Sequence, residues 1–175
     1  MLTKLARNAE LKDKNQCTVN TAAMRITKDL ANLDGTSVAF TQKPDPSNLQ
    51  KLLVTVKPPD GLWAGGTFHF RIDFPNSYPH DPPKATYLGP QRLWHPNIEG
   101  DADRTEWGVC LNILKKDWKP VLGTRDIFFG LEMLFFEPNI DDPLPGTARQ
   151  AATHLRDDPK GFGKKAQQWV KGNYV

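Results

Sequence analysis

Apolar and polar side chains alternate through three stretches in the first half of the chain, as is typical of strands that bury one face. The stretches are Val38 and Phe40, then Leu52, Val54 and Val56, then Phe68, Phe70, Ile72 and Phe74. Ala85 and Tyr87 indicate a short fourth strand. The pattern therefore predicts an antiparallel meander of four strands.

Helical spacing of apolar side chains precedes and follows this sheet. One helix is expected over residues 21–33, and a second is expected to begin with Thr124 as its cap. Two shorter helices are expected over residues 147–155 and 160–170, separated at the Asp-Pro pair of residues 158–159. The C-terminal part of the chain is therefore helical.

Residues 89–123 show little sustained periodicity, although they contain Trp94, Trp107 and Trp118. Segments of this length without regular structure are uncommon unless they are functional. The order of elements predicts an α+β fold with an N-terminal helix, a four-stranded meander, an irregular loop and three C-terminal helices.

The composition fits one globular domain. The chain has 175 residues, of which 38% are hydrophobic, enough for one buried core. We assign this domain to residues 21–175 and interpret the polar residues 1–20 as a flexible tail. A net charge of +3 with scattered acidic residues argues against nucleic acid as a partner. The most apolar run, residues 127–136, is too short to span a membrane, so no membrane contact is expected.

The two cysteines lie in different contexts. Cys17 belongs to the polar tail, whereas Cys110 lies among apolar residues in the irregular segment. A disulfide between them is not expected, and a reducing cytoplasmic or nuclear compartment fits better. Cys110 alone would be interpreted as a buried structural residue. However, Asn97 lies thirteen residues upstream and offers the kind of amide that stabilises an oxyanion when an acyl carbon is attacked.

Five ordered motifs carry a resemblance over nearly the whole chain after residue 20. They are Tyr-Pro-His-Asp-Pro-Pro-Lys at 78–84, His-Pro-Asn-Ile at 95–98, Cys-Leu-Asn-Ile-Leu at 110–114, Trp-Lys-Pro at 118–120 and the acidic turn at 137–144. With these motifs the sequence resembles the ubiquitin-conjugating enzyme family. It is most similar to the branch that conjugates the modifier Nedd-eight to cullins.

The resemblance implies roles for four residues around an active-site loop. Cys110 matches the cysteine that accepts the modifier as a thioester from a heterodimeric activating enzyme. Asn97 matches an amide that either bonds the oxyanion or braces the loop. Asp142 matches an acidic residue that positions and deprotonates the incoming lysine, with capping of the next helix as its alternative. His95 is a candidate base that in the family is chiefly structural. No cofactor is implied, because ATP is consumed upstream by the activating enzyme.

The resemblance also implies docking surfaces for a RING-type ligase, the activating enzyme, a co-ligase and the modifier. The residues that match ligase and activating-enzyme contacts are Arg25, Lys28, His80, Trp118, Lys119 and Pro120. For Arg25 and Lys28 the alternative is a solvated helix face. Phe129 and Met133 match the helix face that packs on the donor modifier, and each is equally compatible with the core.

The chain departs from the family pattern in three places. Residues 99–109 form an acidic insertion before Cys110, which is a candidate gate for the incoming lysine. Trp107 occupies a position where the family has glycine. The tail offers Met1, Leu2 and Leu5 as its only early apolar anchors, with the acetylated Met1 expected to enter a pocket of the co-ligase.

The sequence is also compatible with other functions. The alternatives are a ubiquitin-conjugating enzyme proper and a non-catalytic binding module of the same fold, although Cys110 argues against the latter. A thiol hydrolase would require a histidine that activates the thiol, and only His95 is near in sequence. The four histidines show no metal-ligand spacing, so no metal is expected.

Overall fold

The computed structural model describes residues 21–31, 33, 40–45, 48–89, 92–99 and 106–174. The tail of residues 1–20 lies outside this set, and so do Cys17 and the predicted anchors Met1, Leu2 and Leu5. The tail and the domain boundary at residue 21 stay predictions.

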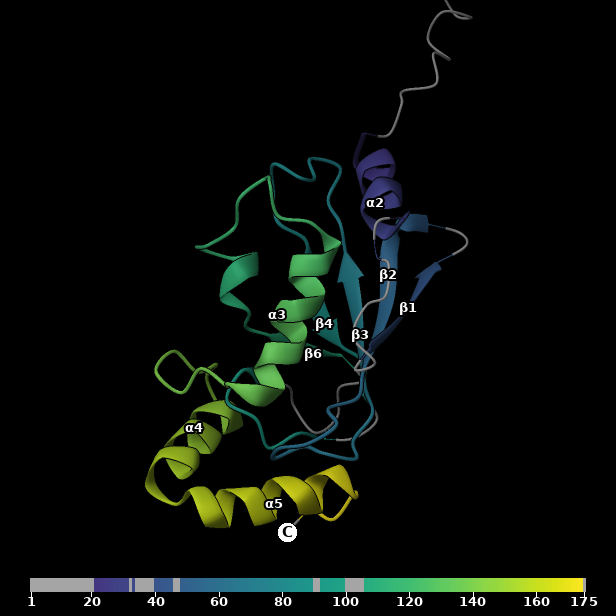
Figure 1. The fold of residues 1–175 in the computed structure, drawn as a ribbon. Coiled ribbons are helices and arrows are strands. Elements are labelled where there is room, and N and C mark those ends of the chain that lie inside the picture. Colours follow the sequence, from purple (N-terminus) through teal and green to yellow (C-terminus); the bar gives the residue numbers. More distant parts are fainter. Residues whose placement is uncertain are drawn as a thin grey trace, which may run out of the picture.

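An antiparallel sheet of six strands forms the centre of the described structure (Figure 1). Its first four strands follow one another as a meander: β1 Phe40–Asp45, β2 Asn48–Val56, β3 Phe68–Asp73 and β4 Lys84–Tyr87. The predicted four-stranded meander is confirmed, whereas Val38 lies outside the described residues. Two short strands, β5 Ile98–Glu99 and β6 Trp107–Val109, extend the sheet in the order β4-β6-β5. The segment expected to be irregular thus contributes strands directly before Cys110.

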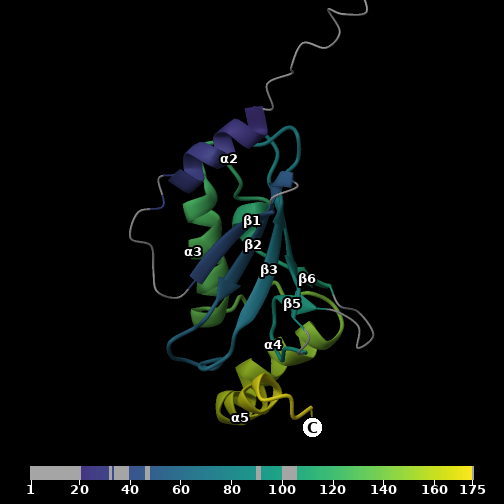
Figure 2. The same ribbon diagram turned by 90° about the vertical axis from the view of Figure 1, so that its right-hand side faces the viewer.

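Within the described residues, four helices pack against the ends and one face of the sheet: α2 Thr21–Ala31, α3 Thr124–Phe136, α4 Thr147–Asp157 and α5 Pro159–Val170. α2 lies at one end of the sheet, and α4 and α5 lie at the other (Figure 2). The predicted break before α5 is confirmed, because the Asp158 side chain caps that helix by accepting from the Gly161 amide at 2.9 Å. None of the helices in the described residues is long and apolar enough to cross a membrane.

The N-terminus of α3 corrects one expectation. Thr124 is the first residue of this helix rather than its cap, and its side chain is buried. Gly123 is the cap residue, and its amide donates to the Asp126 carboxylate at 2.8 Å. A carboxylate in the first turn thus satisfies the amide of the cap residue, and the Thr124 side chain is not the cap.

The core lies between the sheet and α3. Alternate side chains of β2 and β3 point to this side and are buried, as the period of two requires. The rings of Phe68 on β3 and Phe135 on α3 stack with centroids 4.5 Å apart. On β2, by contrast, Leu53 is 42% exposed, so the other face of the sheet is open. α3 is therefore fixed to the sheet by aromatic packing.

Replacing Phe135 with alanine should remove much of this packing. We expect the free energy of unfolding to fall by about 3–5 kcal/mol, the usual cost of deleting a buried phenylalanine ring. Phe136, the next residue, is 40% exposed and provides the control. Phe136→Ala should cost less than about 1 kcal/mol in the same urea titration. Equal losses in the two variants would contradict this account of the core.

Candidate active site

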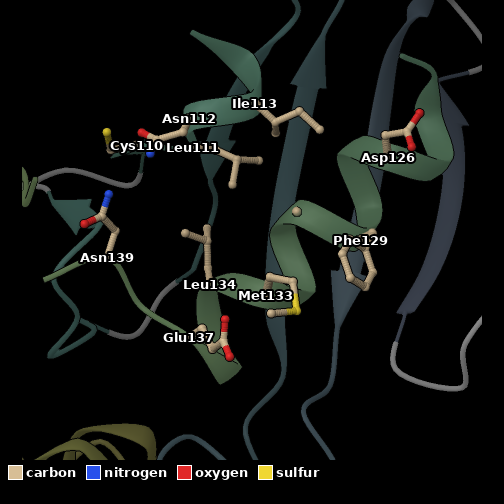
Figure 3. A pocket seen from close by; sticks show the side chains of 11 residues that line it. Cys110, Leu111, Asn112, Ile113, Asp126, Phe129, Met133, Leu134, Glu137 and Asn139 are labelled. Atoms are coloured by element: carbon tan, nitrogen blue, oxygen red, sulfur yellow. The ribbon is translucent and has the colours of Figure 1, made fainter. Parts of the chain in front are cut away.

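Cys110 follows β6 and precedes a short 3₁₀ turn, η2 Asn112–Leu114. It is 7% exposed, and it lies at one end of a groove of about 220 Å³ between this segment and α3. Figure 3 shows Leu111 and Leu134 between Cys110 and the middle of α3. The thiol thus lies at the end of an open apolar channel, where an extended chain can reach the sulfur.

Lys115 is a neighbour of the thiol that sequence reasoning did not identify. Its Nζ donates to the Cys110 Sγ at 3.1 Å, although the side chain is otherwise exposed. The 3₁₀ turn explains this contact, because its backbone bonds reverse the chain: Leu114 N donates to Leu111 O, and Lys115 N donates to Asn112 O, both at 2.9 Å. The residue five positions after the cysteine therefore returns to the sulfur. In the sequence, the only sign of this contact is a lysine five positions after the cysteine.

Asn97 is buried and exchanges two hydrogen bonds with one backbone unit of the acidic turn. Its Nδ2 donates to Asn139 O at 2.9 Å, and its Oδ1 accepts from Asn139 N at 2.8 Å. Its own backbone oxygen accepts from Cys110 N at 2.8 Å. This geometry favours the bracing role of Asn97, since its amide connects the acidic turn to the backbone beside the thiol.

Asn139 continues this network, and sequence reasoning did not identify it. Its Oδ1 accepts from the amides of Asp141 at 3.0 Å and Asp142 at 3.1 Å. The Asn139 side chain therefore stabilises the turn, while Asp142 remains exposed. Capping of α4 is not a role of Asp142, because Gly146 is the cap residue of that helix. Asp142 remains a candidate for contact with an incoming amine.

His95 is a structural residue in this geometry. Its Nδ1 accepts from Asn97 N, and its Nε2 lies opposite Leu134 O, both at 2.9 Å. Since Nδ1 accepts, Nε2 must carry the hydrogen and donate it to α3. Complete burial lowers the pKa of His95 to about 4, so the ring stays neutral and is a weak base. Both nitrogens are occupied, which removes the one histidine that a thiol hydrolase would use.

The two ends of the acidic insertion are each attached to the domain, whereas residues 100–105 lie outside the described set. At one end, the Glu99 carboxylate accepts from Thr147 Oγ1 at 2.8 Å and from Ala148 N, at the start of α4. At the other end, Glu106 accepts from the Arg71 guanidinium, with one contact at 3.1 Å, and this lowers the pKa of Glu106. Whether residues between these ends gate the site stays a prediction.

Trp107, the departure from the family's glycine, belongs to β6 and is buried. Its ring meets Tyr87 edge to face with centroids 6.1 Å apart. The substitution therefore adds an aromatic contact between β6 and β4.

Phe129 and Met133 line the groove from α3. The core alternative is wrong for Phe129, which is 60% exposed, while Met133 is half-buried. With the apolar lining of the groove they form a contiguous apolar patch, and such patches mark interaction sites. These two side chains therefore offer a contact surface next to the thiol.

The predicted docking residues come together around the N-terminal end of α3. Trp118 Nε1 donates to Pro79 O at 2.9 Å, which joins the two loops that carry His80 and Lys119. Arg25 donates to Pro120 O at 3.3 Å and is paired with Asp29, so the solvated alternative is wrong for Arg25. Lys28, His80, Lys119 and Pro120 are exposed.

Val121 adds an apolar side chain to this surface, and sequence reasoning did not identify it. It is 79% exposed. We call His80, Lys119, Pro120 and Val121 the two-loop surface, whereas Lys28 lies on α2. No group of three or more His, Cys, Asp or Glu residues within the described part of the chain could hold a metal ion.

Comparisons with known proteins indicate which family the chain resembles. The sequence model of the family described as "Ubiquitin-conjugating enzyme" matches residues 25–170. The chain is 40% identical over 172 residues to "NEDD8-conjugating enzyme ubc12" of Schizosaccharomyces pombe, covering 98% of this chain and 92% of the relative. It is 34% identical to "Nedd8-conjugating enzyme UbcE2M" of Drosophila melanogaster, covering 99% and 91%. Among solved structures, "S. cerevisiae Ubc12" is 31% identical with a TM-score of 0.78, covering 99% of this chain and 92% of that one.

The bracing role of Asn97 makes a specific prediction. Asn97→Ala removes two hydrogen bonds to the half-buried backbone of Asn139, so unfolding should become easier by about 1–3 kcal/mol. The Asn139 amide should then exchange its hydrogen at least about tenfold faster, as measured by NMR. The exposed Asn173 supplies a control of the same chemistry, and Asn173→Ala should change neither quantity. A variant that loses lysine transfer with unchanged exchange at Asn139 would indicate an oxyanion role instead.

Proposed function

The chain belongs to the ubiquitin-conjugating enzyme family, and we propose that it carries the modifier NEDD8 as a thioester on Cys110 and transfers it to substrate lysines. One observation carries the proposal: Cys110 lies at the end of an open apolar groove, braced by Asn97 against an acidic turn. The relatives named as NEDD8-conjugating enzymes, 34–40% identical over nearly the whole chain, support NEDD8 as the modifier.

Loading exchanges one thioester for another. The Cys110 sulfur, as a thiolate, attacks the carbonyl carbon of the modifier held on a cysteine of the activating enzyme. A C–S bond forms at Cys110, the bond to the other cysteine breaks, and that cysteine leaves as a thiolate. The open groove gives the modifier's C-terminal segment a path along Leu111 and α3 to the sulfur. Phe129 and Met133 lie where a folded modifier would pack beside that path.

Transfer replaces the C–S bond with an isopeptide bond. An uncharged lysine amine attacks the thioester carbonyl, Cys110 leaves as a thiolate, and the amine's proton is released. Asp142 is exposed on a turn that Asn97 and Asn139 hold beside the thiol. Its carboxylate is our candidate for orienting the amine and accepting the proton.

The two-loop surface is the proposed dock for a RING-type ligase, with α2 shared between ligase and activating enzyme. Two loops joined by the Trp118–Pro79 bond present His80, Lys119, Pro120 and Val121 as one exposed patch. Val121 and Pro120 are exposed apolar surface that a docked partner can cover. Cullins, with a co-ligase that holds the acetylated Met1, are the proposed targets, in cytoplasm and nucleus. Ubiquitin in place of NEDD8 is the alternative modifier.

The charging reaction tests the proposal directly. With the NEDD8 activating enzyme, ATP and NEDD8, we expect a one-modifier adduct that disappears when the gel sample is reduced. Cys110→Ser should replace it with at most a slow, reductant-stable oxyester, because oxygen takes the place of the sulfur nucleophile. Cys17→Ser is the matched control and should charge like the unmodified chain.

A parallel reaction with ubiquitin and its activating enzyme identifies the modifier. Charging with NEDD8 at a much higher rate supports the proposal, and preference for ubiquitin would replace NEDD8 in it. Full reductant-sensitive charging of Cys110→Ser would exclude Cys110 as the acceptor.

The docking proposal predicts that Val121→Asp lowers ligase-stimulated transfer by about tenfold, or roughly 1.4 kcal/mol, because a carboxylate replaces the apolar anchor. Transfer is measured from precharged enzyme, so that a change in loading does not contribute. Leu49→Asp is the control, since Leu49 is 51% exposed on β2, outside the two-loop surface. Equal ligase stimulation in both variants would show that the ligase docks elsewhere.

A further inference from the structure

Glu99 lies on β5, yet its carboxylate binds the first turn of α4. The Thr147 hydroxyl donates to this carboxylate at 2.8 Å, and the Ala148 amide donates to it as well. We propose that Glu99 is a positioning residue for lysine transfer, because it holds the acidic turn, and with it Asp142, in a fixed place relative to the thiol. The inference rests on the proposed transfer of the modifier from Cys110 to a lysine.

The first turn of α4 takes its hydrogen-bond acceptor from the sheet. The cap residue of this helix is Gly146, which has no side chain that could accept from the free amides at the helix start. Gly146 has a φ of 73°, in the left-handed region, and a Cβ at this position would lie 2.9 Å from Glu99 Oε1. Glycine thus forms the bend before α4 and also leaves the space that the carboxylate occupies. Glu99 therefore acts as the missing cap of α4.

The position of α4 determines where the acidic turn lies. The turn ends at Leu144, and the cap residue of α4 follows two positions later. From the other end of α4, Arg156 donates to Ile140 O at 3.2 Å. A shift of α4 would therefore move the acidic turn on both sides of Asp142.

Glu99 also belongs to the pair of strands that precedes the thiol. It pairs with Gly108 between β5 and β6, and Cys110 follows β6 directly. Asn97 and Pro96 hold the acidic turn itself through hydrogen bonds, whereas Glu99 holds the helix that follows the turn. The carboxylate thus connects the strands beside the nucleophile to the helix on which the far end of the turn depends.

Loss of Glu99 should affect lysine transfer more than loading. In transfer, the Asp142 carboxylate must orient the amine, and small displacements of an orienting group are costly in rate. Loading uses the groove along α3, which Glu99 does not line. The positioning role is therefore separable from the acceptor role of Cys110.

The test measures discharge of the thioester onto free lysine. The full chain is charged with activating enzyme, ATP and NEDD8, charging is stopped, and loss of the reductant-sensitive band is followed with and without lysine. We expect Glu99→Ala to charge at the normal rate and to discharge onto lysine about tenfold more slowly at neutral pH. Glu106→Ala is the matched control and should discharge normally, because Glu106 lies at the other end of the insertion and binds Arg71 rather than α4.

Two readouts distinguish positioning of Asp142 from a general structural role. In the Asp142→Ala background, Glu99→Ala should slow discharge by less than about twofold further, because both changes remove the same carboxylate from its place. The defect of Glu99→Ala should also shrink at about pH 9, since more of the lysine, whose pKa is about 10.4, is then uncharged without help. Glu99→Gln keeps an acceptor oxygen for α4 and should discharge faster than Glu99→Ala, and it carries the same test if the alanine variant does not fold.

The outcomes separate the inference from the proposed function. Absence of the reductant-sensitive band in the unmodified chain contradicts the proposed function itself. If that band forms, normal discharge of Glu99→Ala or of Asp142→Ala overturns the positioning role. A Glu99→Ala defect that multiplies fully with that of Asp142→Ala, or that is unchanged at the higher pH, overturns it too, because Glu99 would then act independently of Asp142. Charging slowed as much as discharge would assign Glu99 to the general integrity of the domain and would also overturn the inference.

Discussion

Three consecutive residues, His95, Pro96 and Asn97, connect every part of the active site through hydrogen bonds. His95 reaches α3 through Leu134 O, and Pro96 O accepts from Leu144 N at 3.1 Å at the far end of the acidic turn. Asn97 bonds the start of that turn with its side chain and Cys110 with its backbone. Because His95 and Asn97 are themselves buried, losing one of their bonds leaves a polar group without a partner and is costly. The thiol, the long helix and the acidic turn therefore keep one relative position.

This rigid centre lets the groups that must meet other molecules stay exposed. Asp142 lies on a turn whose backbone is fixed by Asn139, so its carboxylate is placed without being buried. Phe129 projects from a helix whose opposite side is stacked on the sheet. In each case buried bonds or packing fix the backbone, and the reactive or binding side chain remains free to contact a partner.

The sequence predicted the elements whose periodicity is local. The alternation in β2 and β3 and the stripes of the C-terminal helices are properties of neighbouring residues, and they identified the meander and the helices. β5 and β6 have two and three residues, too few to show a period, and they exist because Ile98 pairs with Val109 across the insertion. The bracing of Asn97 joins residues 42 apart, and the contact of Lys115 depends on a 3₁₀ turn. Such contacts follow from tertiary structure, which no local pattern encodes. The motifs did identify Cys110 and Asn97, and the structural role that the resemblance implied for His95 is explained by its burial and its two hydrogen bonds.

Glu99 and Glu106 are bound to different parts of the domain, and this determines where the chain can accept inserted residues. Glu99 is held by the start of α4, and Glu106 is held by Arg71. Ile98 and Val109 pair between β5 and β6, and Cys110 follows Val109 directly. Lengthening a loop between fixed ends is inexpensive, at about 0.6 kcal/mol for each doubling of its length. The connection between β5 and β6 should therefore tolerate insertions. Its length can vary during evolution, and a reporter peptide can be inserted there. Neither change need alter the pairing of β6, the strand that precedes Cys110.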